Sequence, residues 1–125
     1  MDRQGLSGME KKARLSWLLA FYGEMLTQNQ RELARLNWEE DYSLSEIAEQ
    51  YSVSRQSVHD TLSRTEKQLE GLEEKLGLLS RFQRMEEGLR ACREELMQIT
   101  PGQDSRGHLD AAVKWIDALL DQEER

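Results

Sequence analysis

The chain has 125 residues, of which 33% are charged, with one cysteine, one proline and a formal net charge of −7 at pH 7. This length allows one domain, or one domain with a helical appendage. No apolar run approaches the roughly 20 residues that a membrane span requires, and the N-terminal segment lacks the apolar core of a secretion signal, so we expect a cytoplasmic protein without a membrane span. Cys92 has no second cysteine to pair with, which excludes an internal disulfide and fits a reducing compartment.

The first part of the chain predicts two helices. Residues 1–8 are expected to form a flexible tail. Residues 11–26 then carry Trp, Leu, Phe, Tyr and Met side chains at helical spacing, which predicts an amphipathic helix. Thr27 and Gln30 have the spacing of a capping box, in which two side chains satisfy the N–H groups at a helix start. This box predicts a second helix, which runs to about Trp38.

Residues 43–70 have the pattern of a helix-turn-helix, in which a short capped helix, a tight turn and a longer helix follow one another. Ser43 and Glu46 form a second capping box, residues 51–53 predict the turn, and Ser54 can cap the longer helix. The apolar side chains of the longer helix are spaced to face inward, at Val58, Leu62 and Leu69. Its first polar side chains then face outward, where contact with base edges and phosphates takes place. The predicted nucleic-acid-binding residues of this helix are Ser54, Arg55, Gln56, Ser57, His59 and Arg64.

The charge of this motif argues against strong nucleic-acid binding. Residues 43–70 contain three basic and five acidic residues, whereas the phosphate backbone normally attracts basic patches. The positive excess lies in residues 1–38, with six basic and four acidic residues. A basic surface would therefore have to combine the longer helix with Lys11, Lys12 and Arg14. The alternative interpretation is that these are scattered solvated charges.

Three segments of the sequence carry a family resemblance: FYGEMLTQNQ at 21–30, EEDYSLSEIAEQYSVSRQSVHDTLSRTE at 39–66, and LEEKLGLL at 72–79. Together they resemble the YlxM family of small bacterial helix-turn-helix proteins, which are similar to the fourth region of sigma factors and unrelated to winged helices. The resemblance covers about residues 9–79. It implies a regulatory or accessory role in the signal recognition particle pathway, with the particle's protein and RNA as partners.

The remainder of the chain predicts further helices. Residues 55–76 form one long helix if Gly77 is its left-handed stop. Ser80 is expected to cap another helix, Pro101 and Gly102 break it, and a last helix runs from about 105 to 123. That last helix presents Leu109, Val113, Ile116 and Leu120. No segment alternates like a strand, so the predicted fold is all-α, with residues 9–100 as the helix-turn-helix domain and 101–125 as an additional helix.

Apolar residues between Leu62 and Phe82 fall near the spacing of a coiled-coil seam and need a partner surface. One interpretation is intramolecular, with the helix after Gly77 folding back onto the long helix and the first helix covering the rest. The other is a homodimer in which the long helices pair. The predicted interface of that homodimer consists of Leu69, Leu72, Leu76, Leu79 and Phe82.

The sequence offers little support for catalysis. His59 and His108 belong to no metal-ligand spacing, and the glycines form no phosphate cradle, so we expect no enzyme, no metal and no cofactor. Cys92 lies on an apolar stripe and is predicted to be a buried thiol. Three functions remain open: an accessory protein of the signal recognition particle pathway, a DNA-binding transcriptional regulator, and a protein-interaction module with a vestigial helix-turn-helix.

Overall fold

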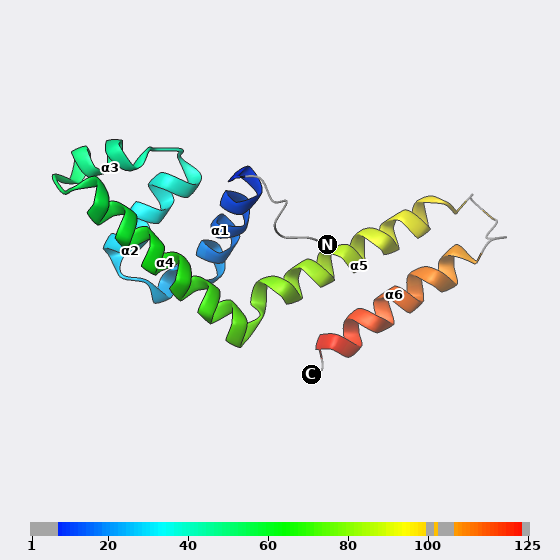
Figure 1. The fold of residues 1–125 in the computed structure, drawn as a ribbon. Coiled ribbons are helices and arrows are strands. Elements are labelled where there is room, and N and C mark those ends of the chain that lie inside the picture. The colour runs from blue at the N-terminus through cyan, green and yellow to red at the C-terminus, as the bar shows by residue number, and fades with distance from the viewer. Residues whose placement is uncertain (1–7, 100–101, 103–106, 124–125) are drawn as a thin grey trace. The chain divides into compact units, whose positions relative to one another are not determined.

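The structure is a computed structural model that describes residues 8–99, 102 and 107–123. All secondary-structure elements of these described residues are helical, so the predicted all-α fold is confirmed there (Figure 1). The chain divides into two compact units, residues 1–79 and residues 80–125. Of the tail expected at residues 1–8, only Gly8 is described, and it begins the first helix. The helix break expected at Pro101 lies outside the described residues.

The first unit holds the helix-turn-helix. Its elements are α1 (Gly8–Tyr22), the 3-10 turn η2 (Gly23–Met25), α2 (Gln28–Ala34), the π-helical turn η3 (Arg35–Glu39), α3 (Leu44–Tyr51) and α4 (Arg55–Leu76). The helix predicted to end near Trp38 is therefore an α-helix that widens into a π turn. That turn contacts α1, α2 and α3, which bury Leu36 and Trp38.

Both predicted capping boxes are confirmed. The Thr27 hydroxyl accepts the N–H of Gln30 at 3.1 Å, and the Gln30 side-chain oxygen accepts the N–H of Thr27 at 3.0 Å. Ser43 and Glu46 make the same exchange at 3.0 and 2.8 Å at the start of α3. The hydrogen bond from the Ser43 N–H first, and then one from the Ser43 side chain, lower the pKa of the Glu46 carboxyl below its usual value. The starts of α2 and α3 are therefore set by side chains three residues apart.

The core of the first unit is built where α4 crosses α1, α2 and α3. Val58, Leu62 and Leu69 are buried, as their spacing predicts, and they pack with Leu18 of α1 and Ile47 of α3. The same inward stripe carries one polar residue, at position 65. It is a buried threonine whose hydroxyl donates a 2.8 Å hydrogen bond to the carbonyl one turn earlier, so the polar group is satisfied within the helix.

Residue Gly77 ends α4 in the left-handed conformation, with φ +64°, and its N–H donates to the Glu73 carbonyl at 2.8 Å. This confirms the predicted stop. The next helix, α5 (Leu78–Met97), starts immediately. Ser80 therefore lies inside α5, and the prediction that it caps this helix is wrong.

The start of α5 is capped by side chains from two other helices. The Leu79 N–H donates to the Glu73 carboxylate at 3.0 Å, and the Leu78 N–H donates to the Tyr22 hydroxyl at 3.1 Å. That hydroxyl in turn donates to Glu73 at 2.7 Å. Burial first, and then the hydrogen bond to Glu73, raise the pKa of Tyr22. This junction ties α1 and α4 to the first turn of α5.

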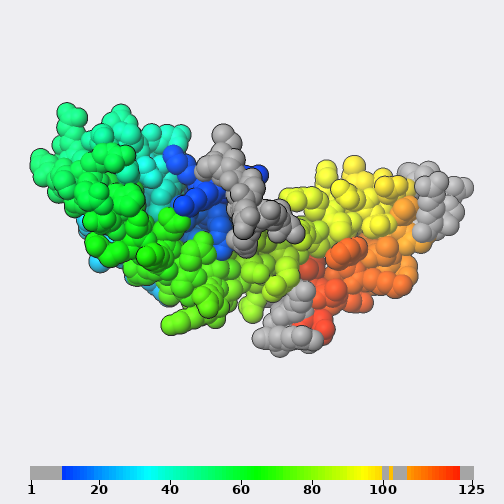
Figure 2. All heavy atoms as spheres, in the orientation of Figure 1, coloured from blue at the N-terminus to red at the C-terminus, as the bar shows by residue number. Residues whose placement is uncertain are grey.

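The second unit is a helical hairpin of α5 from residue 80 onward and α6 (His108–Glu123), as Figure 1 shows. The two helices meet through small residues. The Cys92 thiol lies 3.4 Å from the Ala112 carbonyl, and a Cβ on Gly88 would come within 3 Å of Leu119. Cys92 is buried there, as predicted. In the space-filling view of Figure 2 the side chains of α5 and α6 meet along the hairpin.

The division between the units differs from the boundary expected near residue 100. That expectation placed the whole helix after Gly77 with the helix-turn-helix. In the structure, α5 from Ser80 onward belongs with α6, because its small side chains face α6 and the side chains of Glu95 and His108 approach to 2.6 Å. None of the described helices is long and apolar enough to span a membrane.

Candidate nucleic-acid interface

The turn between α3 and α4 fixes the direction of α4. Ser52 adopts the left-handed conformation with φ 57°, and the Val53 N–H donates to the Ala48 carbonyl at 3.0 Å. The Ser54 hydroxyl then accepts the N–H of Ser57 at 3.0 Å, which confirms the predicted cap of α4. Val58 is buried against α3, so the first turn of α4 is fixed both by the Ser54 cap and by the packing of Val58.

The predicted binding residues at this helix start are all exposed. They lie within a little more than one turn, close to the positively polarised N-terminus of α4, where a phosphate is favoured. They are Ser54, Arg55, Gln56, Ser57 and His59. We call this surface the α4 start face.

An ionised carboxylate lies beside the α4 start face. The Gln56 amide donates to Asp60 at 2.9 Å, and the His59 ring nitrogen lies 3.5 Å from the same oxygen. The hydrogen bond from Gln56 first, and then the one from His59, lower the pKa of Asp60 below its usual value. Asp60 therefore remains an anion next to the face, which opposes close approach of a phosphate.

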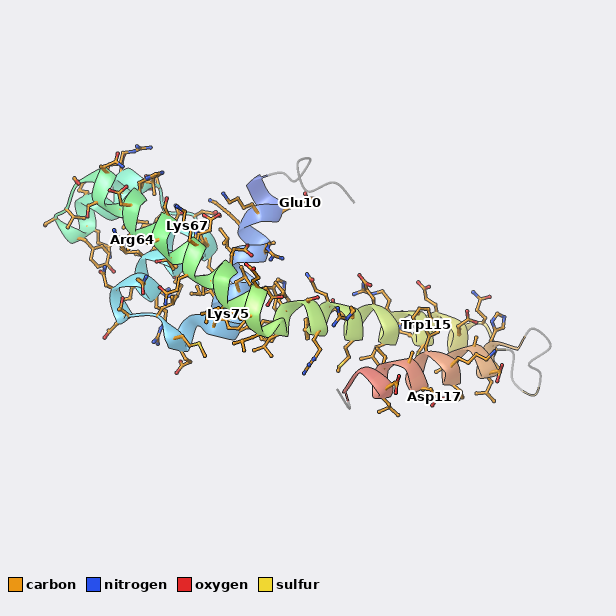
Figure 3. The ribbon with its side chains drawn as sticks, turned by 60° about the horizontal axis from the view of Figure 1, so that its bottom comes forward. Glu10, Arg64, Lys67, Lys75, Trp115 and Asp117 are labelled. Carbon is orange, nitrogen blue, oxygen red and sulfur yellow. The ribbon has the colours of Figure 1, made fainter. Side chains whose placement is uncertain are left out.

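Further along α4, Arg64 is exposed, and its guanidinium lies 3.5 Å from the Thr61 hydroxyl. Lys67 is exposed one turn later, and Figure 3 labels both side chains on α4. The sequence prediction stopped at Arg64 and omitted Lys67, although the three-residue spacing places the two on neighbouring positions of one helix face. The exposed cations of α4 that are nearest its start are therefore Arg55, Arg64 and Lys67.

The basic residues of α1 are ion-paired in the structure. Lys11 lies 3.2 Å from Glu66 and Lys12 lies 3.4 Å from Asp41. Arg14 makes a two-pronged contact with Glu70, at 2.8 and 2.9 Å. Each of the three cations predicted to complete a basic surface thus has an acidic neighbour that offsets its charge.

The two lysines lie beside α4, the helix that would recognise nucleic acid in a helix-turn-helix. Lys11, Lys12 and His59 line a hollow of about 380 Å³ between α1, η3, α3 and α4, whose floor includes Leu15 and Leu62. Arg14 does not line it. The structure therefore gathers part of the predicted set around one concave surface, but with its positive charge largely compensated.

The residues predicted to form a dimer interface occupy different environments. Leu69 and Leu79 are buried in the core of the first unit, and Leu72 packs against that core. Leu76 is exposed and Phe82 is half-buried. Placing Leu69 and Leu79 at an interface was therefore a misassignment, because the same chain already covers them; the intramolecular interpretation of this stripe holds for these two residues.

Among the described residues, no group of three or more His, Cys, Asp or Glu side chains is arranged to hold a metal ion. The capped recognition helix, the left-handed turn before it and the helical core behind it define a helix-turn-helix protein.

The chain belongs to the UPF0122 family. The family model, described as "Putative helix-turn-helix protein, YlxM / p13 like", matches residues 9–105. The match confirms the resemblance to the YlxM family and extends past residue 79, where the resembling segments end.

Several relatives are similar over most of their length. A UPF0122 protein of Geobacillus kaustophilus is 42% identical over 111 residues, which cover 89% of this chain and 98% of that protein. The UPF0122 protein YlxM of Bacillus subtilis is 38% identical over 111 residues, covering 89% of this chain and 97% of that protein. A UPF0122 protein of Desulforamulus reducens is 50% identical over 74 residues, which cover 59% of this chain and 63% of that protein.

Proposed function

We propose that this protein is a non-enzymatic regulatory or accessory protein of the signal recognition particle pathway, whose helix-turn-helix binds nucleic acid through the α4 start face. The observation that carries the proposal is the exposed, capped first turn of α4, which presents Arg55, Gln56 and His59. A guanidinium, an amide and an imidazole are side chains that contact base edges and phosphates. The link to the particle comes from the YlxM resemblance.

The charge around this face supports weak binding that depends little on salt. Arg55, Arg64 and Lys67 are the exposed cations nearest the start of α4, while Lys11 already pairs with Glu66. About three phosphate contacts give a log–log salt slope of about −3 on duplex DNA and about −2 on a single strand. A slope near −8 would contradict this count.

A protein partner is the second candidate, and a specific observation favours it. The protein is acidic, with a net charge of −7, and its cations Lys12 and Arg14 are already paired with acidic residues, so it suits a basic partner surface. An RNA-binding protein subunit of the particle has that chemistry. We further propose that the protein acts as a homodimer, as the surplus of apolar helix surface in the sequence predicts.

The proposal is tested with the double substitution Arg55→Ala and Gln56→Ala. Binding is measured against particle RNA, particle protein and genomic DNA fragments, by fluorescence anisotropy at two or more salt concentrations. We expect at least a tenfold loss of affinity for the nucleic acid that binds, because both side chains lie on the α4 start face, and each base contact contributes roughly 1–3 kcal/mol.

The matched control is Arg81→Ala with Gln83→Ala, which removes the same two residue types from exposed positions on α5. Both double variants should keep wild-type stability within about 0.5 kcal/mol, as is usual for exposed substitutions. If the Arg55 and Gln56 variant binds all three partners as well as the wild type does, the helix-turn-helix is a scaffold. Loss of particle-protein binding alone would favour the second candidate.

A further inference from the structure

The hairpin of α5 and α6 leaves most of its large apolar side chains uncovered. Leu109, Val113, Ile116 and Leu120 are 43–57% exposed, although their spacing predicts the inward stripe of α6. The side facing α5 instead carries Ala112 and the half-buried Leu119. Small residues on this side let the two helices approach closely, so the large aliphatic side chains are turned to a flank of the hairpin.

Most of the uncovered residues of both helices lie on one side; Met97 and Trp115, which are 71% and 45% exposed, are the exceptions. On α5, Leu89 and Leu96 follow the α6-facing positions 88 and 95 by one residue, a rotation of about 100°. On α6, the stripe containing Val113 follows Ala112 in the same sense. Because the helices run antiparallel, equal rotations seen from each N-terminus point to the same flank of the hairpin. We call this flank the hairpin face; it consists of Leu89, Leu96, Leu109, Val113, Ile116 and Leu120.

The hairpin face is large enough to support association. Its six side chains, about half exposed, leave several hundred Å² of apolar surface, comparable to the largest patch of a typical monomer, roughly 300–600 Å². Two such faces would bury about 1,000 Å² in total, near the lower limit for a specific interface. A second copy of the same face therefore supplies a sufficient partner surface.

Charges along the outer edges of the hairpin face fit a second copy. The edge on α5 carries Arg90 and Arg93, and the edge on α6 carries Asp110 and Asp117. All four lie at exposed positions, and Figure 3 labels Asp117 on α6. In the single chain, Arg90 lies 3.7 Å from Glu86, and Asp110 lies 3.4 Å from a lysine one turn later. With these ion-pair partners, Glu86 and Lys114, counted, the α5 edge keeps an excess of basic residues and the α6 edge an excess of acidic residues, which is self-complementary under a suitable two-fold rotation.

We propose that the hairpin face binds a second copy of this chain, with the two-fold axis parallel to the helices, to form an antiparallel four-helix bundle. This rotation places α5 of one copy on α6 of the other and keeps every residue at its own height. Gly88 lies at the level of Leu119, and Cys92 at the level of Ala112. These heights bring Arg90 near Asp117 of the second copy and Arg93 near Asp110.

This inference rests on the homodimer of the proposed function and specifies which surface forms its interface and which symmetry relates the two copies. It does not depend on nucleic-acid binding. A dimer that fails to bind nucleic acid would overturn the binding proposal alone, whereas a monomer that binds it would overturn the dimer alone.

The first test is the full-length Val113→Glu variant, studied by sedimentation velocity. We expect a dimer for the wild type at tens of micromolar and at least a 100-fold weaker dimer for the variant, because a carboxylate would be buried without a partner. The control is Ala118→Glu, which adds the same charge to an exposed position of α6 on the other flank and should leave the dimer intact. Circular dichroism checks that both variants keep their helix content.

The second test exchanges the edge charges. One variant carries Arg90→Glu and Arg93→Glu, and the other carries Asp110→Arg and Asp117→Arg. Each alone should dimerise about tenfold more weakly at low salt, since its edges then repel. An equimolar mixture should regain the wild-type dimer, because each mixed seam again pairs opposite charges.

Three results would overturn the inference. The first is a wild type that stays monomeric at about 50 µM, a concentration far above the dissociation constant of an ordinary specific dimer. The hairpin face would then have to bind another part of this chain or a different protein. A Val113→Glu variant that dimerises like the wild type would place the interface elsewhere. A mixture of the charge variants that stays as weak as its components would exclude the two-fold arrangement.

Discussion

The Tyr22 hydroxyl joins three helices, and its removal should destabilise the first unit substantially. It donates to Glu73 of α4 at 2.7 Å and accepts the N–H of Leu78, the first residue of α5, at 3.1 Å. The ring itself is buried, with 1% of its surface exposed. Tyr22→Phe keeps the ring and its packing, so the substitution tests the hydroxyl alone.

The magnitude follows from the two lost contacts. A hydrogen bond to a charged carboxylate contributes about 1.5–3 kcal/mol. The Leu78 N–H is only part-buried, so losing its acceptor costs less than the roughly 1–3 kcal/mol of a fully buried group. The two effects share one oxygen, and water can reach part of this site, so they do not add fully. We expect the free energy of unfolding to fall by about 2–3 kcal/mol. For a unit of 79 residues, this lowers the midpoint temperature by about 10–20 °C.

The assay is urea unfolding followed by circular dichroism and tryptophan fluorescence, with amide hydrogen exchange at Leu78 and Leu79 as a local measurement. Exchange at both amides should accelerate, because the capping network then lacks its central hydroxyl. Tyr42→Phe is the control, since Tyr42 is 37% exposed. A loss below about 0.5 kcal/mol for Tyr22→Phe, no larger than an ordinary surface substitution, would refute this account of the junction.

Two further predictions concern the same junction. Gly77→Ala should lower the free energy of unfolding by about 1–2 kcal/mol, because Gly77 has φ +64° and a side chain strains the left-handed conformation. Gly71→Ala, in the open interior of α4, should instead raise it by about 0.5–1 kcal/mol. Urea unfolding of both variants would measure these opposite effects. Burial and the bond to Glu73 raise the pKa of Tyr22, so its contribution is complete below the ordinary tyrosine pKa of about 10 and is lost as pH rises through the raised folded value. The stability difference between the wild type and Tyr22→Phe should therefore shrink above about pH 10, and a difference that grows would contradict the assigned direction.

The sequence alone determined where most helices of the first unit start and stop. The capping boxes at Thr27 and Ser43, the cap at Ser54 and the stop at Gly77 all depend on groups within four residues of one another. Such local hydrogen bonds and backbone preferences are independent of what packs on the helix later. The helix-turn-helix and its exposed α4 start face follow from these signals together with the inward spacing of Val58.

Only the tertiary structure decided how the charged residues are used. Arg14 meets Glu70, 56 residues away in sequence, and Lys11 meets Glu66. Composition shows that acidic and basic residues are present, but an ion pair depends on which helix faces cross. For that reason the sequence identified the basic residues of the predicted surface but not the acidic residues that pair with them.

Tertiary structure also decided which face of each apolar helix is covered. Periodicity locates an apolar stripe and cannot say what lies against it, so Leu79 was assigned to a dimer and is buried in its own core. On α6, the predicted inward stripe at Val113 is exposed, because Gly88 and Ala112 allow the helices to approach on the neighbouring side. The cap of α5 was mispredicted at Ser80 for the same reason. Its hydrogen-bond acceptors come from distant helices, and only folding brings them to the first turn.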